Sequence, residues 1–165
     1  MKSQKDCGTV AYRMHVIAGD AAELAANAGG LIVDRMMSGW RVSVQLLKDG
    51  PDDVRPIRIL GAELVDEAAS PGLPDEEQYV LVMGAEAYAR AISGDGQQLP
   101  AGYTEALLWG ESPDPSHLLG HSLSSAARAF KTLAVTAACI SADEVSAAEA
   151  FTSMNARGGG VPLRA

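Results

Sequence analysis

The sequence predicts an α/β fold: a single-domain sheet of about five strands, at least partly parallel, with packed helices and a helical C-terminal third. Two observations lead to this prediction. Residues 10–18, Ala21–Met37 and residues 40–47 read as strand, helix and strand, which is the order of a βαβ unit with parallel strands. Further along, the apolar run at residues 79–83 passes directly into the helical run Ala85–Ile92. Ligands of such sheets bind outside the carboxyl ends of the strands, so these junctions are the first place to look for a site.

The first helix has a clear N-terminal signal. Asp20 is expected to be its N-cap, because an aspartate side chain accepts hydrogen bonds from the free backbone N–H groups of the first turn. Apolar residues then recur at helical spacing from Leu24 to Met36. Gly29 and Gly30 interrupt this run at a cost of about 1 kcal/mol each relative to alanine, and we expect them to let the sheet approach the helix backbone closely. A helix that begins after the glycines is the alternative.

The middle of the chain is expected to add three strands. Residues 55–65 (RPIRILGAELV) predict a third strand, because Ile57 and Ile59 alternate with polar residues, and Gly61 is expected to mark a bulge. Residues 79–83 (YVLVM) predict a buried strand, since valines favour strands. One helix running from near residue 76 through both segments is the competing interpretation. Glu105–Trp109 predicts a short fifth strand.

The C-terminal third is expected to be helical. The segment from Ser122 to Ile140 has a wide, alanine-rich apolar face, with Ser122 as its N-cap. A second helix is expected over residues 141–157, because Ser141 to Glu144 has the sequence of a capping box. We therefore predict one domain over residues 1–157 and a flexible tail over residues 158–165. The Ser122–Ile140 face is wider than one sheet face covers, so we expect a homo-oligomer through this helix, with packing by the last helix as the alternative.

Composition limits the partners. The chain has 165 residues, a formal net charge of −8 and a pI near 4.8, so a broad nucleic-acid or anionic-membrane surface is disfavoured by repulsion. No stretch approaches the roughly 18 apolar residues of a membrane span, and residues 1–6 are polar, unlike a signal peptide. Cys7 and Cys139 are too few for a disulfide scaffold. We expect a cytoplasmic protein with no nucleic-acid partner, no membrane partner and no bound cofactor.

Acidic residues follow several of the predicted strands. If the strands are parallel, one rim of the sheet gathers four carboxylates: Asp20, Asp49, Glu86 and Glu111. Carboxylates at such a rim can hold Mg²⁺ or another hard cation. Alternatively, Asp20 is only a helix cap, Asp49 is a turn residue and the glutamates are solvated. The same junction disfavours a nucleotide phosphate, because it offers Gly19 followed by a negative charge in place of a glycine-rich loop.

Two histidines and two tryptophans are further candidates. His117 and His121 stand four residues apart, so on one helical turn both could face Zn²⁺, with surface or capping roles as the alternative. The zinc-protease motif is incomplete, because Leu118 stands where that motif has a glutamate. Trp40 and Trp109 lie beside glycines at strand ends, where most tryptophans plug the edge of a core and a minority line a pocket.

Three stretches of the chain resemble uncharacterised actinobacterial proteins: residues 29–40 (GGLIVDRMMSGW), residues 55–62 (RPIRILGA) and residues 126–131 (AARAFK). The resemblance implies no activity. The sequence shows no convergent acid, base and nucleophile, so we interpret the chain as a non-enzymatic binding or regulatory protein that acts through a protein partner or a small ligand. The alternative is a small metal-assisted enzyme that uses the carboxylate rim. The candidate ligand-binding residues are Asp20, Trp40, Glu86, Glu111, His117 and His121.

Overall fold

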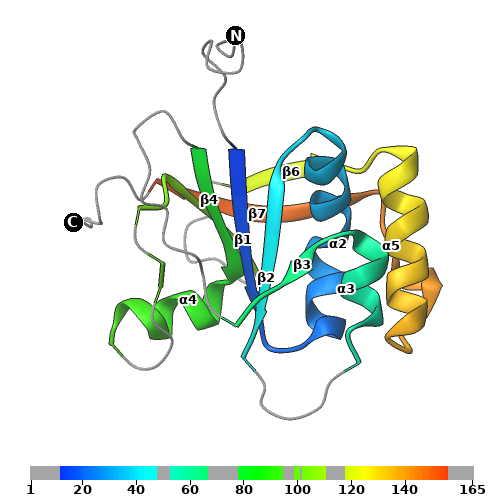
Figure 1. The fold of residues 1–165 in the computed structure, drawn as a ribbon, viewed down its shortest axis with the longest axis horizontal. Helices are drawn as coiled ribbons and strands as arrows, with labels where there is room; N and C mark the ends of the chain where they lie inside the picture. Colours follow the sequence, from blue (N-terminus) through cyan, green and yellow to red (C-terminus); the bar gives the residue numbers. More distant parts are fainter. Residues whose placement is uncertain are drawn as a thin grey trace, which may run out of the picture.

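A computed structural model describes residues 12–47, 53–66, 78–94, 99–100, 102–110 and 118–155 (Figure 1). The strands are β1 (Tyr12–Ala18), β2 (Arg41–Leu46), β3 (Glu63–Leu64), β4 (Gln78–Gly84), β5 (Glu105–Trp109), β6 (Leu118–Ser122) and β7 (Ala148–Asn155). The helices are α2 (Ala21–Met37), α3 (Arg55–Leu60), α4 (Ala85–Ile92) and α5 (Ser125–Ala137), with a 3₁₀ turn η2 (Ala142–Glu144). Within these residues the strand order is β3-β2-β1-β4-β5-β7-β6, parallel up to β5 and antiparallel on both sides of β7. The α/β class is confirmed, whereas the described part of the sheet has seven strands instead of about five.

The two faces of the sheet are covered differently. Helices α2, α3 and α5 pack against one another on one face, and α4 lies on the other (Figure 1). Side chains of β1 alternate between the two layers: Met14 and Val16 join the larger core, which includes α2, and Ile17 joins the smaller core, which includes α4. The neighbouring strands β1 and β4 therefore send their helices to opposite faces. The gap between their carboxyl ends is the topological switch point of the sheet.

The βαβ unit at the start of the chain is confirmed. α2 begins after Asp20, whose Oδ1 accepts a hydrogen bond from the Glu23 N–H at 2.9 Å, so Asp20 is the predicted N-cap. The helix runs unbroken through Gly29 and Gly30, which excludes the alternative start. β4, α4 and β5 also match the predicted elements, and the competing single helix across β4 and α4 is wrong.

The predicted third strand, residues 55–65, is a helix followed by a two-residue strand. Pro56 lies in the first turn of α3, where its fixed φ and its missing N–H suit a helix. Ile57 and Leu60, three positions apart, are both buried, so burial follows a helical period rather than every second residue. Gly61 does not mark a bulge. It ends α3 in the left-handed region, at a φ of 90°.

Only the middle of the C-terminal third is helical. α5 starts after Ser124 rather than at Ser122, because Ser122 pairs with β7 as the last residue of β6. The helix also ends at Ala137, three residues before the predicted boundary. Ser141 accepts a hydrogen bond from the Asp143 N–H as a cap should, but this cap starts only the short turn η2.

The last predicted helix is instead the strand β7. Glu149 and Phe151 are buried, while Ala148 and Ala150 are exposed, so the side chains alternate with the period of a strand. Pairing with β5 and β6 outweighs the helical preference of the alanines. The tail predicted at residues 158–165 lies outside the described residues, and the domain bounds remain a prediction.

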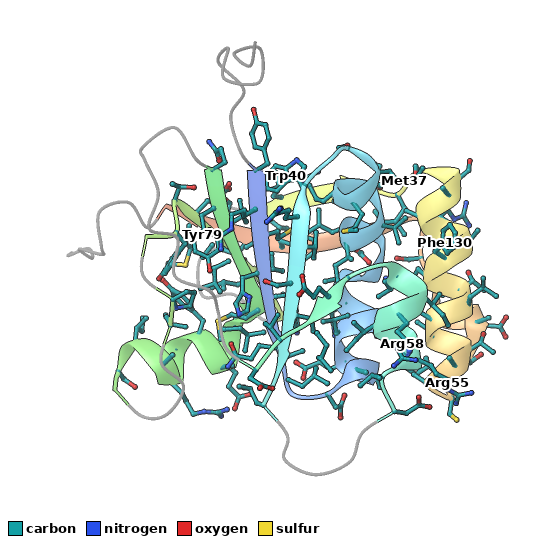
Figure 2. The ribbon with its side chains drawn as sticks, in the orientation of Figure 1. Met37, Trp40, Arg55, Arg58, Tyr79 and Phe130 are labelled. Atoms are coloured by element: carbon teal, nitrogen blue, oxygen red, sulfur yellow. The ribbon has the colours of Figure 1, made fainter. Side chains whose placement is uncertain are left out.

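α5 presents two large apolar side chains to solvent. Phe130 is 43% exposed and Leu133 is 55% exposed, whereas Ala127 and Ala134 on the inner side are buried. Figure 2 shows Phe130 on α5, away from the sheet. The homo-oligomer expected through this helix remains a prediction. Among the helices that the structure describes, none is both long and apolar enough to cross a membrane.

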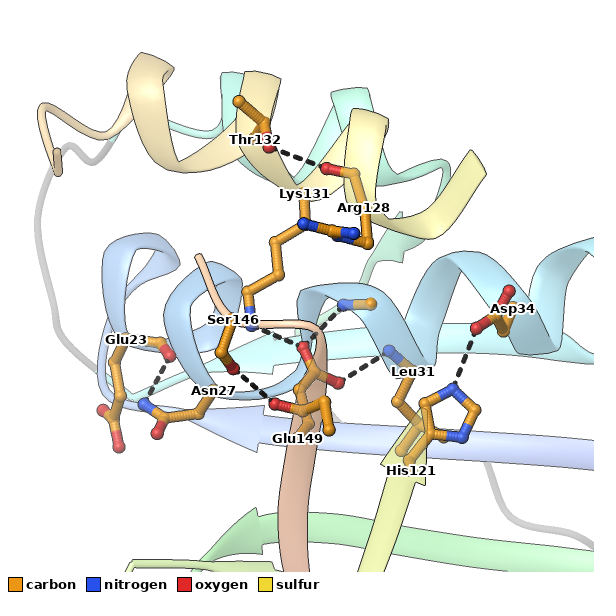
Figure 3. A network of polar contacts seen from close by, with 12 residues as sticks. Glu23, Asn27, Leu31, Asp34, His121, Arg128, Lys131, Thr132, Ser146 and Glu149 are labelled. Carbon is orange, nitrogen blue, oxygen red and sulfur yellow. Dashed lines mark hydrogen bonds and ion pairs between the residues drawn. The ribbon is translucent and has the colours of Figure 1, made fainter. Parts of the chain in front are cut away.

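The side chain of Glu149 brings a buried carboxylate against the middle of α2 (Figure 3). Its Oε2 accepts hydrogen bonds from the Gly30 N–H and the Lys131 ammonium, both at 2.7 Å, and its Oε1 accepts one from the Leu31 N–H at 2.8 Å. Lys131 is 3% exposed and Glu149 is 5% exposed. A Cβ on Gly30 would lie 2.3 Å from Cγ of Leu123, so only glycine fits there. The neighbours of the glycine pair are not the parallel strands that were predicted. Gly30 packs closely against Leu123, the residue after β6, whereas the side chains of α3 and α5 beside Gly29 leave room for a Cβ.

Gly30→Ala is expected to lower the free energy of unfolding by about 1–3 kcal/mol, because the added methyl group overpacks the contact with Leu123. Gly29→Ala is the matched control. Its Cβ would meet its nearest neighbour, the Lys131 side chain, at 3.4 Å, and alanine favours a helix by about 1 kcal/mol over glycine, so stability should hold or rise. Urea unfolding followed by circular dichroism measures both variants. Equal midpoints for Gly30→Ala and the wild type would contradict this packing.

Glu149→Gln is expected to lower the free energy of unfolding by about 3–5 kcal/mol, because it leaves the Lys131 ammonium buried without its counter-charge. The double variant that adds Lys131→Met removes that orphan charge and should recover part of the loss. Glu86→Gln, which breaks an exposed pair with Arg90, is the control and should change stability by less than about 1 kcal/mol. A double variant less stable than Glu149→Gln alone would refute the pairing.

Candidate functional site

The candidate site is a cavity of about 780 Å³ at the carboxyl ends of β1, β4 and β5. We call it the switch-point cleft, because β1 and β4 part there toward helices on opposite faces. The residues that give it its chemistry are Gly19, Glu23, Gly84, Glu86, Arg90 and Trp109. They come from the segments that follow these strands and from the first turns of α2 and α4.

Glu23 bridges two strand ends in the cleft. Its Oε1 accepts a hydrogen bond from the Gly19 N–H at 2.9 Å, and its Oε2 accepts one from the Trp109 Nε1–H at 3.1 Å. Two glycines make room for this carboxylate: a Cβ on Gly19 would lie 2.8 Å from Oε1, and one on Gly84 would lie 3.2 Å from the Trp109 Nε1. The side chain is therefore held in one orientation by β1 on one side and β5 on the other.

This arrangement decides which ligand groups the cleft favours. A carboxylate has about four lone-pair positions, and the two donors leave capacity for further donors. Glu23 also stands in the first turn of α2, where the helix dipole favours a negative charge. The positive end of the helix is thus already matched by the chain itself, and an anion entering the cleft would meet a carboxylate. Apolar groups of Ile17 and Leu47 form part of the wall. The cleft suits a ligand that donates hydrogen bonds and carries an apolar part.

The predicted carboxylate rim is realised in part. Glu86 lines the cleft, with 88% of its side chain exposed and an Arg90 nitrogen 3.6 Å away. Asp20 stands at the same edge as the cap of α2 and does not line the cleft. Asp49 and Glu111 lie outside the described residues. Within the part of the chain that the structure describes, no three His, Cys, Asp or Glu side chains are grouped as metal ligands.

Sequence reasoning missed Glu23, although a signal for it exists. It stands three residues after the N-cap, which is the position from which a capping-box glutamate reaches back toward the start of its helix. Here the carboxylate reaches one residue further back, to the Gly19 N–H. Its second partner, Trp109, is 86 residues away in the sequence and could not be read from the local pattern.

His121 belongs to a structural cluster rather than to the cleft. It lies in the strand β6, so the helical turn that was to pair it with His117 is absent there, and His117 itself is outside the described residues. The His121 Nε2 lies 2.9 Å from Oδ2 of Asp34 on α2 (Figure 3). The Ser124 hydroxyl donates to Oδ1 of the same aspartate at 2.5 Å. Burial alone would raise the pKa of Asp34, but the hydrogen bonds from Ser124 and His121 outweigh it and lower that pKa.

Trp40 lies at the opposite edge of the sheet from the cleft, beside the amino ends of the strands (Figure 2). Its ring stacks on that of Tyr12, with 5.0 Å between centroids, and the Arg35 guanidinium lies 5.1 Å from its ring centre. The predicted site residues are therefore separated. Asp20 and Glu86 stand at one edge of the sheet, Trp40 at the other, and His121 at the far strand.

A buried histidine lies on the α4 face of the sheet, between the two edges. His15 on β1 is fully buried, with its Nδ1 2.7 Å from the Ser43 Oγ and its Nε2 3.0 Å from the Gln45 Oε1. The amide oxygen of Gln45 can only accept, so Nε2 carries the proton and Nδ1 accepts from the Ser43 hydroxyl. Burial lowers the pKa of His15; the hydrogen bond to Gln45 opposes this, and the positive charge of Arg13 adds to it.

No protein-family model matches the chain, and no curated protein matches it. Several solved structures share its fold. A deacetylase–bog complex from the biosynthesis pathway of teicoplanin aligns with a TM-score of 0.51 at 10% identity, over 89% of this chain and 100% of that one. The deacetylase–teicoplanin complex gives a TM-score of 0.51 at 10% identity, over 87% and 98% of the two chains. The zinc-inhibited form of teicoplanin deacetylase gives 0.50 at 10% identity, over 89% and 100%. At this identity the similarity is one of fold.

Because of His15, the free energy of unfolding is expected to decrease as the pH is lowered below 6.5, the ordinary pKa of histidine. The folded-state pKa is lowered, so the unfolded chain takes up the proton first; the stabilisation present above pH 6.5 is lost as the pH falls toward the folded pKa. One such group contributes a slope of at most about 1.4 kcal/mol per pH unit. Urea midpoints of the wild type and of His15→Gln, measured from pH 7.5 to 5, should converge as the pH falls. Parallel profiles would contradict the assignment.

Proposed function

We propose that this chain is a non-enzymatic binding protein, and that it holds a small molecule bearing an amino group in the switch-point cleft. One observation carries the proposal: the Glu23 carboxylate is fixed by the Gly19 N–H and the Trp109 Nε1–H at the switch point of a parallel sheet. Ligands of open α/β sheets bind at this point. The cavity volume of about 780 Å³ is that of a small-molecule site.

The charge of the cleft supports an ammonium rather than an anion. Glu23 and Glu86 both line it, and Arg90 at the rim already faces Glu86. An ammonium group can donate to the free lone pairs of Glu23, and a charge-assisted hydrogen bond is about twice as strong as a neutral one. The net charge of −8 on the whole chain also favours cationic over anionic ligands. The apolar wall at Ile17 and Leu47 suits an alkyl or ring portion next to the amino group.

The side chains of the cleft support binding rather than catalysis. Nucleophilic catalysis needs a hydroxyl, thiol or amine within reach of a base, and the described lining residues include no Ser, Cys, Lys or His. Glu23 is the best-placed carboxylate, and both of its oxygens already accept hydrogen bonds. Such a group is well suited to orient a donor on a ligand.

A small metal-assisted enzyme is the second candidate. The observation that favours it is that Glu23 and Glu86 line the same cleft, since hard cations take carboxylate oxygens. The two candidate functions predict different ligands for the cleft. An amine ligand should bind without metal under the first, whereas Mg²⁺, Mn²⁺ or Zn²⁺ alone should bind under the second.

The test is a titration that reports from inside the cleft. The chain has two tryptophans, so Trp40→Phe leaves Trp109 as the sole indole fluorophore, next to Glu23. We expect n-hexylamine, charged at pH 7, to change the Trp109 emission, and n-hexanol and n-hexanoate to bind at least about tenfold more weakly, which is the worth of about 1.4 kcal/mol. Adding Glu23→Gln to this variant should abolish the preference for the amine.

Glu86→Gln in the same background is the matched control, because Glu86 lines the same cleft with an exposed side chain. It should keep most of the amine preference. Equal binding of the three hexyl compounds would refute the proposal. Saturable binding of Mg²⁺, Mn²⁺ or Zn²⁺, lost in both Glu23→Gln and Glu86→Gln, would replace it with the metal-assisted alternative.

A further inference from the structure

The switch-point cleft is lined by charged side chains of opposite sign that come from two different helices. Glu23 stands in the first turn of α2, and Arg90 stands in the last turn of α4. The two helices lie on opposite faces of the sheet (Figure 1), so the carboxylate and the guanidinium belong to different walls of the cleft. A ligand that is bound at Glu23 can therefore extend toward Arg90.

Arg90 is only loosely engaged by the chain itself. One of its terminal nitrogens lies 3.6 Å from an oxygen of Glu86, which is too far for a hydrogen bond. Both side chains are exposed, and exposed ion pairs contribute little to stability. Among the interactions of the described residues, this pair is the one that involves the Arg90 guanidinium. Its N–H donors are therefore available to a ligand that accepts hydrogen bonds.

The helix geometry separates the two charges by several bond lengths. Gly84 marks the position of Glu23 at the start of α4, because a Cβ on Gly84 would lie 3.5 Å from the Glu23 Oε2. From residue 84 to residue 90 the helix rises by about 9 Å, at roughly 1.5 Å per residue. The Arg90 side chain reaches back one turn toward Glu86. The guanidinium and the Glu23 carboxylate are thus separated by about 5–9 Å along the helix, between one and two turns.

The wall between the two charged groups is largely apolar. Ile17 and Leu47 line the cleft from the sheet side, and Ala87 and Ala89 line it from α4. An alkyl chain that crosses the cleft can lie against these side chains and remove them from water. An α-amino acid is too short to reach both charges, because its ammonium and carboxylate are attached to the same carbon. A longer chain with one charged group at each end fits the spacing.

We propose, on the basis of the amine-binding function proposed for this cleft, that its ligand is an ω-amino acid. The ammonium group at one end donates to Glu23, and the methylene chain lies against the apolar wall. The carboxylate at the other end replaces Glu86 as the partner of Arg90. An arginine holds a carboxylate best through two parallel N–H···O bonds, and the 3.6 Å pair with Glu86 does not provide them. The ligand carboxylate stays at the rim and does not meet Glu23.

The test compares three compounds of equal chain length by titration of the Trp109 emission in the full-chain Trp40→Phe variant. These are 6-aminohexanoate, n-hexylamine, which lacks the carboxylate, and 1,6-diaminohexane, which carries a second ammonium group instead. We expect 6-aminohexanoate to bind at least about threefold more tightly than n-hexylamine. This gain should shrink as salt is added, because the rim is exposed. The diamine should bind less tightly than 6-aminohexanoate.

Two substitutions at the rim should act in opposite directions. Arg90→Gln should remove the gain of 6-aminohexanoate over n-hexylamine. Glu86→Gln should increase that gain, because it removes the carboxylate that competes for Arg90. Arg58→Gln is the matched control, since Arg58 is an exposed arginine of α3 that does not line the cleft, and it should leave the gain unchanged. Urea midpoints check that each variant folds.

The outcomes separate this proposal from the amine-binding function. If 6-aminohexanoate binds no more tightly than n-hexylamine, and the amine is still lost in Glu23→Gln, the ω-amino acid is wrong and the amine-binding function stands. An unchanged gain in Arg90→Gln would also overturn the proposal. Tighter binding of the diamine would overturn it in favour of a second ammonium at Glu86. If none of the three compounds binds in a manner that depends on Glu23, both proposals fall together.

Discussion

The arrangement of this molecule depends on one buried carboxylate. Glu149 comes from β7, near the end of the described chain, yet its oxygens accept hydrogen bonds from two backbone N–H groups in the middle of α2 and from Lys131 on α5. A buried charge is tolerated only when it is paired and hydrogen-bonded, so these three elements must come together in one relative position. Gly30 makes the approach possible, since any side chain there would collide with Leu123. The cost of Gly30 within a helix is offset by this contact.

The position of α2 in turn determines the switch-point cleft. The helix that Glu149 holds at its middle begins at Asp20, and its first turn carries Glu23 to the gap between β1 and β4. From there Glu23 reaches Trp109 at the end of β5. The switch-point cleft and the cavity beside Trp40 and Tyr79 lie at opposite ends of the same parallel strands. Parallel pairing produces this separation, because it collects all carboxyl ends at one edge and all amino ends at the other.

The elements that the sequence predicted are those whose signals are local. β1, α2 and β2 followed from an N-cap at Asp20 and from apolar periodicity, and β4 with α4 followed from a valine-rich run that passes into a helical one. The sequence-based predictions fail for segments whose structure depends on pairing with residues distant in the sequence. β7 reads as helical from its alanines, but β5 and β6 lie on either side of it, so the segment forms a strand. At residues 55–65 the error was one of period. Pro56 at the start and Gly61 at the end are helix signals that outweigh the apparent alternation.

In the candidate sites, too, some features follow from local sequence signals and others depend on contacts between distant residues. Parallel pairing predicts acidic residues at the carboxyl edge, and the structure places Asp20 and Glu86 there. Residue spacing could not show that Glu23 is the fixed carboxylate of the cleft, because its position depends on a hydrogen bond from Trp109, 86 residues away in the sequence. Asp20, the more obvious candidate, is occupied with its own helix. Trp40 lines a cavity, but this cavity lies at the amino ends of the strands. Ligand sites of α/β sheets are expected at the carboxyl ends. The register that places the Arg13 and Arg41 side chains on one face of the sheet at the amino ends could likewise be known only from the pairing of β1 with β2.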